Sequence, residues 1–504
     1  MTPVRPPRWW LPLSALLLVL AFVPWSRWAE ALEGVLPPLL ILVAPAPALA
    51  AVAAGADWRA WTLFTALWWL PVVSWLIWLD PQLGIPCWLV TAGIGGSWTL
   101  LLGWLLRRLR RRWGPSLFLW WAPVVWMAWE GLKGGTSLGT PWCSLVHAFW
   151  RLPVLCQLAE VTGAGALSAV VVCCAAGLAR WLLGRRHDAL QAAFGLGLLA
   201  GLAFYGAARL AAIDVAAGPA VRVALVQPNV PFADKRTADP ALLLDDALAL
   251  TAQAPRDTEL AVWPETAVPT HLAELPQYAE PMAAEVRRLG LSVIAGALYS
   301  CRGDGSWEPA RVNAALVYAP DGRVVEVAAK VRIVPFGEYT PGRRYRLMRS
   351  LARKSPQFFA APRFRAVDSP VGRLGLAICY ESIFAADTRT LVRDGAQALV
   401  AITNDDQLLQ MGARQHYQQA VFRCIETRRW LARSANGGIS AFVDPAGRVV
   451  AQTPWSARAV LPGTIRLRGD RTPFVRLGPW CWWLALAASA WALFGRAPRK
   501  RDTM

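Results

Sequence analysis

Three polar residues stand where the chain leaves an apolar, strand-like segment, and together their types could activate a thiol as a nucleophile. Glu265 follows residues 261–264 (AVWP), Cys379 follows residues 374–378 (LGLAI), and Lys330 lies just before an apolar turn. Catalytic groups in α/β folds are commonly placed at strand ends. A thiol needs a base to become a thiolate, and a nearby ammonium stabilises both the thiolate and a later oxyanion. The three residues therefore predict one active site that contains a carboxylate, an ammonium and a thiol.

Each of these residues also has an ordinary structural explanation. A cysteine at the end of an apolar strand is usually a small core residue, and a glutamate after a proline often lies in the first turn of a helix. The lysine could be an exposed strand residue. His416 could instead serve as the base for Cys379, but it opens a predicted helix and the chain offers Glu265 for that role. The case for an active site therefore depends on the wider sequence.

Two further glutamates stand near the candidate lysine and cysteine. Glu338 follows Lys330, and Glu381 follows Cys379. Either glutamate could orient the lysine or keep it protonated, and either could equally be a structural acid that pairs with a buried cation. We treat both as supporting candidates.

The cysteine pattern indicates neither a metal centre nor a disulfide scaffold. The nine cysteines include no C-x-x-C pair and no Cys/His spacing suited to a metal ion. Only Cys301, Cys379 and Cys424 lie in the polar part of the chain, so at least one thiol there is free or intermolecular. We expect no metal and no other cofactor.

From residue 221 onward, short β-branched runs alternate with helical stretches. The predicted strands are residues 221–227, 260–263, 292–298 and 399–403, and the predicted helices are residues 240–253, 277–289 and 413–431. Residues 324–334 and 438–443 are predicted strands without intervening helices, which favours a mixed sheet or stacked sheets over a doubly wound fold. The pattern predicts an α/β domain of about 250 residues with its own core.

The composition of the whole chain argues against a purely soluble protein. Hydrophobic residues make up 55% of the 504 residues and charged residues only 17%. The 29 tryptophans outnumber the 16 phenylalanines and 8 tyrosines, as expected where indole rings lie at membrane interfaces. Eight apolar runs are candidate membrane helices: residues 9–25, 33–54, 60–79, 85–106, 115–130, 163–184, 189–210 and 477–495.

The positions of the basic residues predict how these helices are oriented. With the N-terminus in the cytoplasm, every strong basic cluster faces inside, including the five arginines at residues 107–112 and the basic residues at 496–501. The predicted organisation is a seven-helix membrane domain (1–214), an extracytoplasmic catalytic domain (215–475), and an eighth helix with a basic cytoplasmic tail (476–504). Because the net charge of +19 is spread over these parts and no nucleic-acid signature occurs, we expect no nucleic-acid partner.

Longer motifs around the candidate residues match a known family. The matching stretches are WPET at 263–266, Lys330 with PFGE at 335–338, and CYE at 379–381. With them the sequence resembles the nitrilase, or carbon–nitrogen hydrolase, superfamily, which implies a Glu-Lys-Cys triad on an α-β-β-α sandwich. Seven helices before this domain and one after it, with GTPW at 139–142, QH at 415–416 and RSANGG at 433–438, resemble the bacterial apolipoprotein N-acyltransferases over nearly the whole chain.

This resemblance implies a two-step acyl transfer at the outer leaflet of the bacterial cytoplasmic (inner) membrane. The implied donor is a glycerophospholipid, and the implied acceptor is the free α-amine of a diacylglyceryl-cysteine lipoprotein. In this interpretation Glu265 is the base, Cys379 carries the acyl group as a thioester, and Lys330 stabilises the oxyanion. The partners expected are therefore the two lipid-bearing substrates and the bilayer.

One segment departs from the family pattern. After the strand that follows the cysteine, the family usually has Asn-Asp, a small residue and Trp, followed by an aromatic residue. This chain has Asn404 and Asp405 followed by Asp406, Gln407 and Leu408. The expected aromatic wall is missing, so Asp406 and Gln407 are candidate lipid-contacting positions where this chain would differ from its relatives.

Other candidate lipid contacts lie outside the triad motifs. Trp142 belongs to a loop that could enter the membrane interface, although an ordinary turn with an anchoring tryptophan is the simpler explanation. Residues 343–354 carry Arg343, Arg344 and Arg346 among aromatic and aliphatic residues. Such a segment is usually a solvated basic face, but its place after the PFGE motif favours a lid that touches lipid headgroups.

Two other functions fit parts of this pattern. A membrane-anchored amidase or nitrilase-type hydrolase would give the acyl group to water, because the triad does not determine the acceptor. A non-catalytic membrane scaffold with a decayed nitrilase-like domain is disfavoured, since Glu265, Lys330 and Cys379 are all present. A transporter is less consistent still, because the apolar runs contain few charged residues.

Overall fold

The structure is a computed structural model that describes residues 7–23, 32, 34–79, 83–136, 141–184, 189–301, 310–340, 342, 345–346 and 357–495. The chain forms two compact units. One comprises residues 1–212 together with 477–504, and the other comprises residues 213–476.

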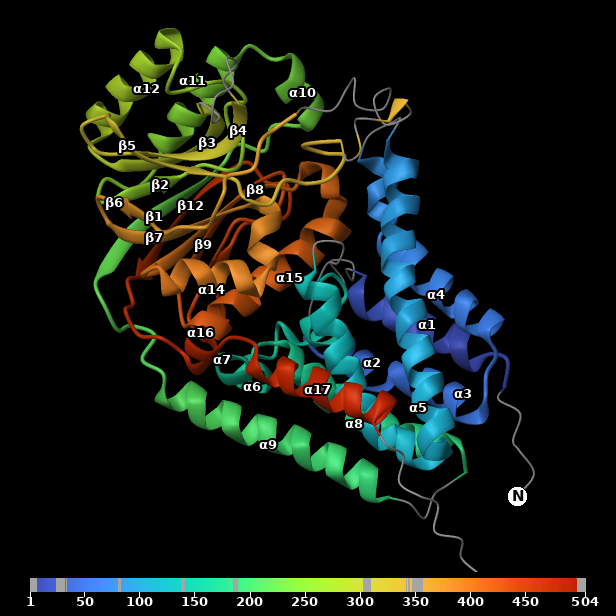
Figure 1. The fold of residues 1–504 in the computed structure, drawn as a ribbon. Helices are drawn as coiled ribbons and strands as arrows, with labels where there is room; N and C mark the ends of the chain where they lie inside the picture. Colours follow the sequence, from blue (N-terminus) through green and yellow to red (C-terminus); the bar gives the residue numbers. More distant parts are fainter. Residues whose placement is uncertain are drawn as a thin grey trace, which may run out of the picture. The chain divides into compact units, whose positions relative to one another are not determined.

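The second unit contains two six-stranded sheets among its described residues (Figure 1). The first sheet has the order β12 (Ala459–Arg466), β1 (Ala220–Gln227), β2 (Leu260–Val262), β3 (Ser292–Cys301), β4 (Ala310–Tyr318) and β5 (Val324–Ala329). The second sheet has the order β11 (Val449–Gln452), β10 (Ala441–Val443), β9 (Leu431–Asn436), β8 (Ala398–Asn404), β7 (Gly372–Ile378) and β6 (Val367–Ser369).

Each sheet is parallel at its centre and antiparallel at its edges. Strands β1, β2 and β3 pair in parallel, as do β7, β8 and β9. The remaining pairs, including β1 with β12 and β9 with β10, are antiparallel. Parallel strands bring their carboxyl ends to the same edge of a sheet, which is where polar residues that follow the strands can meet.

Apolar side chains from both sheets form one core between them. Val223 and Leu225 of β1 belong to the same buried cluster as Ile378 of β7 and Val400 of β8. Burying each such side chain contributes about 1.5–3 kcal/mol. This core explains why the central strands read as continuous apolar runs, since parallel strands covered on both faces show little alternation.

Helices cover the outer faces of the two sheets (Figure 1). Helices α11 (Pro240–Thr251) and α12 (Pro276–Leu289) bury Leu244 and Val286 in a second cluster with residues of β3 and β4. Helices α14 (Ala385–Arg393) and α15 (Leu409–Thr427) lie on the side of the second sheet. The two sheets between two helical layers confirm the predicted α-β-β-α sandwich.

Two predicted elements end earlier than expected. The strand predicted for residues 324–334 stops at Ala329, because the following segment turns away into the site described below. The helix predicted for residues 413–431 runs from Leu409 to Thr427, and Arg428 adopts a left-handed conformation (φ 53°) before β9 begins. At the end of the helix, a residue in the left-handed conformation, not a change in hydrophobicity, ends the element.

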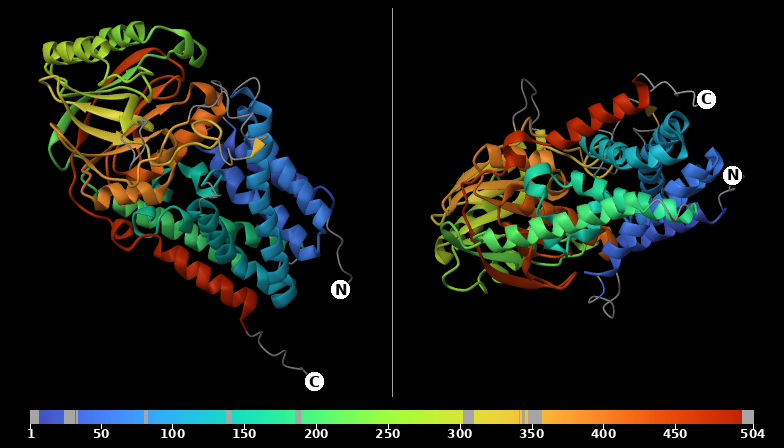
Figure 2. Two further views of the ribbon diagram at one scale, coloured as in Figure 1. Left: turned by 45° about the horizontal axis from the view of Figure 1, so that its top comes forward. Right: turned by 90° about the horizontal axis from the view of Figure 1, so that it is seen from below.

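The first unit is helical (Figure 2). Its principal helices are α1 (Trp10–Phe22), α2 (Leu36–Val43), α3 (Pro45–Ala54), α4 (Trp58–Val72), α5 (Gly84–Gly135), α8 (Gly165–Leu182), α9 (Leu190–Ala212) and α17 (Trp480–Phe494). Among the described residues, four helical stretches are long and apolar enough to cross a membrane: 36–54, 84–135, 165–182 and 190–212. Each of the eight predicted apolar runs is helical for most of its length; the number of spans stays a prediction.

Helix α5 folds back on itself at Gly114. This glycine has a non-helical conformation with a positive φ (φ 75°, ψ 172°), which a residue with a side chain rarely adopts. The indole Nε1 of Trp129 donates to the carbonyl oxygen of Trp98 at 2.6 Å, so the segments before and after Gly114 lie side by side. The two predicted helices 85–106 and 115–130 are thus the two arms of α5, and the arginines of residues 107–112 lie next to the turn.

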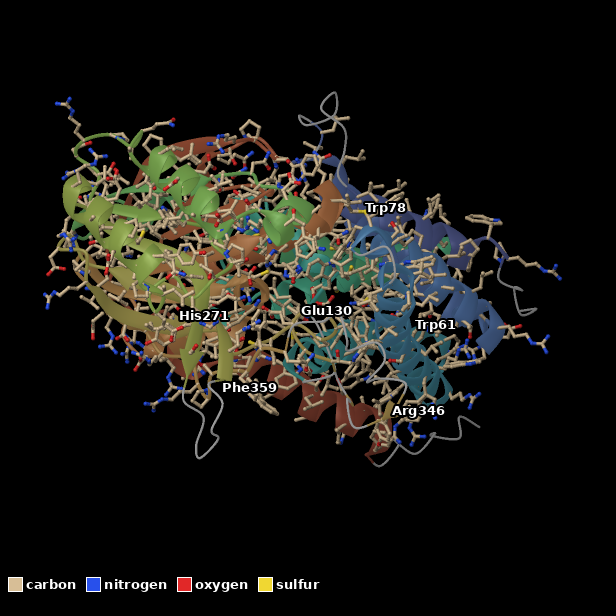
Figure 3. All side chains as sticks on the ribbon, turned by 90° about the horizontal axis from the view of Figure 1, so that it is seen from above. Trp61, Trp78, Glu130, His271, Arg346 and Phe359 are labelled. Carbon is tan, nitrogen blue, oxygen red and sulfur yellow. The ribbon has the colours of Figure 1, made fainter. Side chains whose placement is uncertain are left out.

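The tryptophans divide between the surface and the interior of this unit. Trp78 is 72% exposed, whereas Trp61 is fully buried (Figure 3). The Trp61 indole donates to the carbonyl oxygen of Thr99 at 2.9 Å, and Trp482 donates to that of Ala128 at 3.0 Å. Several indoles therefore connect helices from inside the unit, in addition to the interfacial positions that the composition predicts.

Candidate active site

The structure brings Glu265, Lys330 and Cys379 together. Glu265 follows β2, Lys330 follows β5 and Cys379 follows β7, so the three side chains come from the ends of strands in both sheets. The ammonium of Lys330 donates to Glu265 Oε1 at 2.8 Å, and the thiol of Cys379 donates a hydrogen bond to the Glu265 carboxylate. Glu265 is the common partner of the other two residues.

Glu265 is 6% exposed and is held by four donors. Besides Lys330 and Cys379, the Nδ2 of Asn313 on β4 donates to its Oε1 at 2.7 Å, and the backbone N–H of Asn404 donates to its Oε2 at 3.1 Å. Burial raises the pKa of a carboxyl, but the charge of Lys330 and these hydrogen bonds outweigh burial. The net effect lowers the pKa of Glu265, so its carboxylate is ionised.

Lys330 is 1% exposed and lies between two carboxylates. Its ammonium donates to Glu265 and to Glu338 Oε1, the latter at 2.9 Å. Burial lowers the pKa of an ammonium, but the charges of Glu265 and Glu338 outweigh it and raise the pKa of Lys330 well above its ordinary value. The lysine is therefore a permanent cation in this site.

The two supporting candidates have different positions. Glu338 contacts the ammonium of Lys330, and its Oε2 accepts the backbone N–H of Val334 at 2.7 Å. Glu381 instead accepts backbone N–H groups: those of Val331 at 2.6 Å, Arg332 at 3.0 Å and Ile378 at 2.7 Å. Glu381 thereby ties the segment after the lysine to the residue before the cysteine. Burial raises the pKa of Glu381 to about 7 against these hydrogen bonds.

Cys379 stands at a sharp turn between β7 and a 3₁₀ helix that begins with it (Cys379–Ile383). Its φ of 54° is unusual for a residue with a side chain and costs on the order of 1–3 kcal/mol, a strain often found at functional sites. Burial and the charge of Glu265 raise the pKa of this thiol, and the charge of Lys330 only partly opposes them. The resting side chain is therefore a thiol, which needs a base to react.

A buried network that the sequence did not reveal supports the cysteine from behind. The Nε2 of His416 on α15 lies 3.1 Å from the carbonyl oxygen of Cys379, and its Nδ1 lies 3.0 Å from Asp405 Oδ1. Arg433 on β9 donates to Asp405 Oδ2 at 2.6 Å. Burial alone would raise the pKa of Asp405, but the charges and hydrogen bonds of Arg433 and His416 outweigh burial. The net effect lowers this pKa. His416 thus contacts the backbone of Cys379, and Glu265 holds the thiol.

A second unpredicted residue is Lys235 on α10 (Phe232–Thr237). It is 6% exposed and donates to the carbonyl oxygen of Thr266 at 3.1 Å, next to Glu265 in the chain. Burial lowers its pKa to about 8, although the charges of Glu265 and Asp406 oppose this shift. A buried lysine with two acidic neighbours was not foreseen because its partners are distant in sequence.

The segment that departs from the family pattern has a structural role. Asp406 and Gln407 lie in a 3₁₀ turn (Asp406–Leu408), and Asp406 Oδ2 accepts the backbone N–H of Phe232 at 2.7 Å. Asp406 therefore holds the first residue of α10. Gly437 packs so closely that an added Cβ would lie 2.7 Å from Asp406 Cα. Whether this turn contacts lipid stays a prediction.

The other predicted lipid contacts are only partly described. Trp142 is 7% exposed, its ring lies 5.6 Å from that of Trp75, and its carbonyl oxygen accepts from Lys133 Nζ at 2.6 Å. Arg346 is exposed (Figure 3). Arg343 and Arg344, residues 347–354 of the predicted lid, and residues 139 and 140 of the GTPW motif lie outside the described residues, so the lid stays a prediction.

Possible metal-binding groups and the two other cysteines of the second unit, Cys301 and Cys424, are the remaining candidates for chemistry. Within the described ranges, no group of three or more His, Cys, Asp and Glu side chains could hold a metal ion. Cys424 is a free, fully buried cysteine, and burial raises its pKa well above the ordinary value. The side chain of Cys301 lies outside the described residues.

Two solved structures align with about half of this chain. A carbon-nitrogen hydrolase from Helicobacter pylori aligns over 53% of this chain and 94% of its own length, with 18% identity and a TM-score of 0.39. The NitFhit protein of C. elegans aligns over 50% of this chain and 61% of its own length, with 22% identity and a TM-score of 0.40.

Comparison of sequences extends over both units. Residues 222–469 match the carbon-nitrogen hydrolase family, and residues 14–177 match the family described as apolipoprotein N-acyltransferase N-terminal domain. The apolipoprotein N-acyltransferase of Sinorhizobium medicae is 34% identical over 71% of this chain and 69% of its own. That of Azotobacter vinelandii is 32% identical over 79% and 77%, and that of Geobacter metallireducens is 29% identical over 83% of each chain.

Proposed function

The chain belongs to the apolipoprotein N-acyltransferase family, and from this premise we propose the reaction that its site performs. A fatty acyl chain passes from a glycerophospholipid to the sulfur of Cys379 and then to the α-amine of a lipoprotein whose N-terminal cysteine carries a diacylglyceryl group. The observation that carries this proposal is the Glu265 carboxylate, which accepts hydrogen bonds from both the Cys379 thiol and the Lys330 ammonium.

In the first step the phospholipid ester is cleaved. Glu265 takes the thiol proton as the sulfur of Cys379 attacks the ester carbonyl carbon, and the carbonyl oxygen becomes an oxyanion beside Lys330. When the carbon–oxygen bond breaks, Glu265 returns the proton to the leaving alkoxide. The products of this step are a thioester on Cys379 and a lysophospholipid.

In the second step the thioester is converted to an amide. The α-amine of the acceptor attacks the thioester carbonyl carbon, and Glu265 accepts the proton that the amine loses. Lys330 again stabilises the oxyanion. The carbon–sulfur bond then breaks, the thiolate recovers a proton from Glu265, and the site returns to its starting state.

The electrostatics of the site set the resting protonation states. The lowered pKa of Glu265 keeps it ionised and the raised pKa of Cys379 keeps the sulfur protonated, so the proton moves to Glu265 only as the sulfur attacks the carbonyl carbon. The raised pKa of Lys330 keeps its charge available at every stage. General base catalysis of this kind typically contributes about 10²- to 10⁴-fold to the rate.

We also infer that the catalytic unit lies on the periplasmic side of the inner membrane. The arginines of residues 107–112 lie at the fold-back of α5, and such a cluster favours the cytoplasm. A reporter fused after residue 112 should report the cytoplasm, and one inserted at the exposed turn near residues 320–321 should report the periplasm. The reverse pattern would contradict the proposed orientation.

The function is tested by supplying both substrates to the purified full-length protein. Phospholipid and a synthetic diacylglyceryl peptide with a free amine should yield an N-acylated peptide, detected by mass spectrometry, together with lysophospholipid. The Cys379→Ala protein, prepared identically, should yield neither product. Free fatty acid without N-acylated peptide would favour the hydrolase instead.

A further inference from the structure

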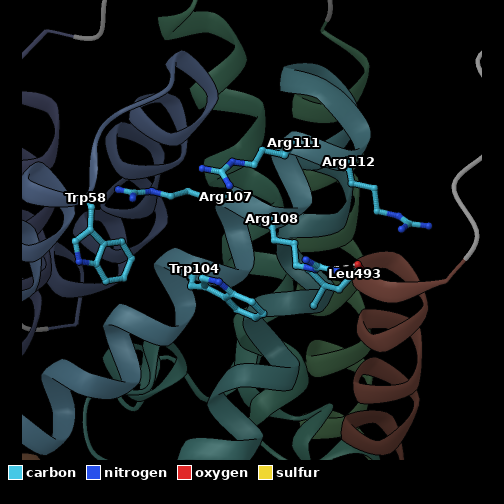
Figure 4. Close-up of a pocket in the computed structure, with 7 residues that line it drawn as sticks. All are labelled: Trp58, Trp104, Arg107, Arg108, Arg111, Arg112 and Leu493. Atoms are coloured by element: carbon cyan, nitrogen blue, oxygen red, sulfur yellow. Dashed lines mark hydrogen bonds between the residues drawn. The ribbon is translucent and has the colours of Figure 1, made fainter.

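The helical unit contains a cavity of about 410 Å³ lined by four arginines and two tryptophans (Figure 4). The arginines are Arg107, Arg108, Arg111 and Arg112 of α5, and the tryptophans are Trp58 of α4 and Trp104 of α5. The cavity also reaches the C-terminal end of α17. It contains none of the residues assigned to acyl transfer.

Backbone carbonyl groups, not carboxylates, hold these arginines in place. Arg108 Nε donates to the carbonyl oxygen of Leu493 at 3.1 Å, and Arg112 donates to that of Gly495. Arg107 donates to the carbonyl oxygen of Asp57. The carbonyl groups at the C-terminal end of α17 attract cations but do not neutralise them. The guanidinium groups of Arg108 and Arg112 are therefore positioned with their charge largely intact, whereas Arg107 also interacts with the charge of Asp57.

The cavity has buried donors without partners, and its described lining carries four arginines and no acidic residue. The Nε atoms of Arg107 and Arg112 are buried and have no hydrogen-bond partner among the described residues. None of the described residues that line the cavity is acidic. The nearby carboxylate of Asp57 accepts the backbone N–H of Ala60 at 2.7 Å, at the start of α4. Buried, unsatisfied donors on fixed arginines fit a ligand with several anionic oxygen atoms.

The same cavity presents apolar surface beside the arginines. Trp58 and Trp104 are 45% and 46% exposed, and Arg107 stacks on Trp58 with its guanidinium carbon 5.0 Å from the ring centre. Arg108 stacks in the same way on Phe494 at 4.6 Å. A ligand that satisfies both surfaces has an anionic head and an apolar chain, whereas an inorganic anion would leave the tryptophans uncovered.

We propose that this cavity binds an anionic phospholipid, with the headgroup phosphate on Arg107, Arg108 and Arg112 and the acyl chain against Trp58 and Trp104. The general preference for basic residues on the cytoplasmic side of a membrane explains why this segment contains many arginines. It does not require that their side chains share one cavity or that buried N–H groups remain unpaired. The site does not depend on acyl transfer, so either proposal can fail without the other.

The test measures lipid retention by the purified full-length protein with native mass spectrometry. Phosphatidylglycerol is the anionic probe, and phosphatidylcholine is the probe without net charge. The protein should retain phosphatidylglycerol, and R107Q/R112Q should bind it roughly tenfold more weakly. The matched control is R59Q/R110Q, which removes the same charge. Arg59 is exposed, Arg110 donates to the carbonyl oxygen of Ala53 at 2.8 Å, and neither lines the cavity.

A second measurement separates the lipid from a free anion. Phosphatidylglycerol should raise the melting temperature of the native protein and of R59Q/R110Q but not that of R107Q/R112Q, and inorganic phosphate should raise none of them. If the double variant does not fold, R108Q with R110Q as its control replaces the pair. Equal retention of both lipids, equal loss in the control variant, or equal stabilisation by inorganic phosphate would each overturn the proposal.

Discussion

The imidazole Nε2 of His416 lies 3.1 Å from the carbonyl oxygen of Cys379, so this histidine contacts the backbone of the cysteine. Its other ring nitrogen lies 3.0 Å from the buried Asp405, which Arg433 also holds. A histidine in this position can keep the strained turn at Cys379 in place, while the proton of the thiol goes to Glu265. Two residues near one cysteine thereby have different tasks.

This arrangement predicts that His416→Gln slows acylation without abolishing it. The substitution weakens the contact with the Cys379 carbonyl oxygen, and a small displacement of a nucleophile commonly costs about ten- to a hundredfold in rate. Intact-mass measurements over time, with phospholipid alone, give the rate of adduct formation. Complete loss of the adduct in a folded variant would make His416 the base.

Cys379→Ala should form no acyl adduct when the protein is exposed to phospholipid. The matched control is Cys424→Ala, which removes a fully buried thiol whose raised pKa makes it a poor nucleophile. That control should still gain the mass of one acyl chain. An adduct that survives in Cys379→Ala would move the nucleophile to another residue.

Glu265→Gln should lower the rate of thioester formation by about 10²- to 10⁴-fold, because an amide cannot accept the thiol proton. The variant keeps the size of the side chain, and Lys330 keeps Glu338 as an acidic partner. Glu280→Gln on α12 is the control, because Glu280 is exposed and its substitution removes the same charge. Normal turnover of Glu265→Gln would exclude this glutamate as the base.

The buried Lys235 predicts a pH-dependent contribution to stability. Its pKa falls from the ordinary 10.5 to about 8 on folding, because burial outweighs the nearby charges of Glu265 and Asp406. The folded protein therefore holds this proton less tightly than the unfolded chain. The resulting cost is present in full below about pH 8 and disappears as the pH rises to 10.5.

Lys235→Met should accordingly have a higher free energy of unfolding than the native protein at low pH, and this advantage should shrink as the pH rises. Its advantage should be larger at pH 7 than at pH 10, by up to about 3 kcal/mol. Thermal unfolding of both proteins in the same detergent at the two pH values measures this difference. A difference in melting temperature that is the same at both pH values would contradict the predicted titration.

The turn at Asp406 and Gln407 should influence which phospholipid serves as donor. Asp406→Ala with Gln407→Trp restores apolar surface, and burial of a lipid chain there contributes on the order of 1–3 kcal/mol. The ranking of donors should therefore change, as measured by competition between phospholipids that differ in acyl chain.

The control for this prediction is Asp406→Ala alone. It removes the hydrogen bond to Phe232 but adds no aromatic surface, so it should slow all donors alike. An unchanged donor ranking in the double variant would mean that this turn does not line the acyl site.

Much of this protein follows from its sequence because the relevant signals are local. Apolar runs of spanning length become helices, and the short β-branched runs at residues 221–227 and 399–403 become β1 and β8. A polar residue at the end of such a strand is directed to a sheet edge by the strand itself. For this reason Glu265, Lys330 and Cys379 are candidates by their positions, and the longer motifs around them distinguish them from structural residues.

The tertiary structure alone decided the features that depend on distant partners. Asn313, 48 residues from Glu265, shares that carboxylate, and Glu381 reaches back 50 residues to the backbone of Val331. The conformation of Gly114 likewise turns two apolar runs into antiparallel arms. Hydrophobic periodicity specifies which face of an element is buried but carries no information about its neighbour. Which groups meet at Cys379 is therefore determined by how the two sheets pack against each other.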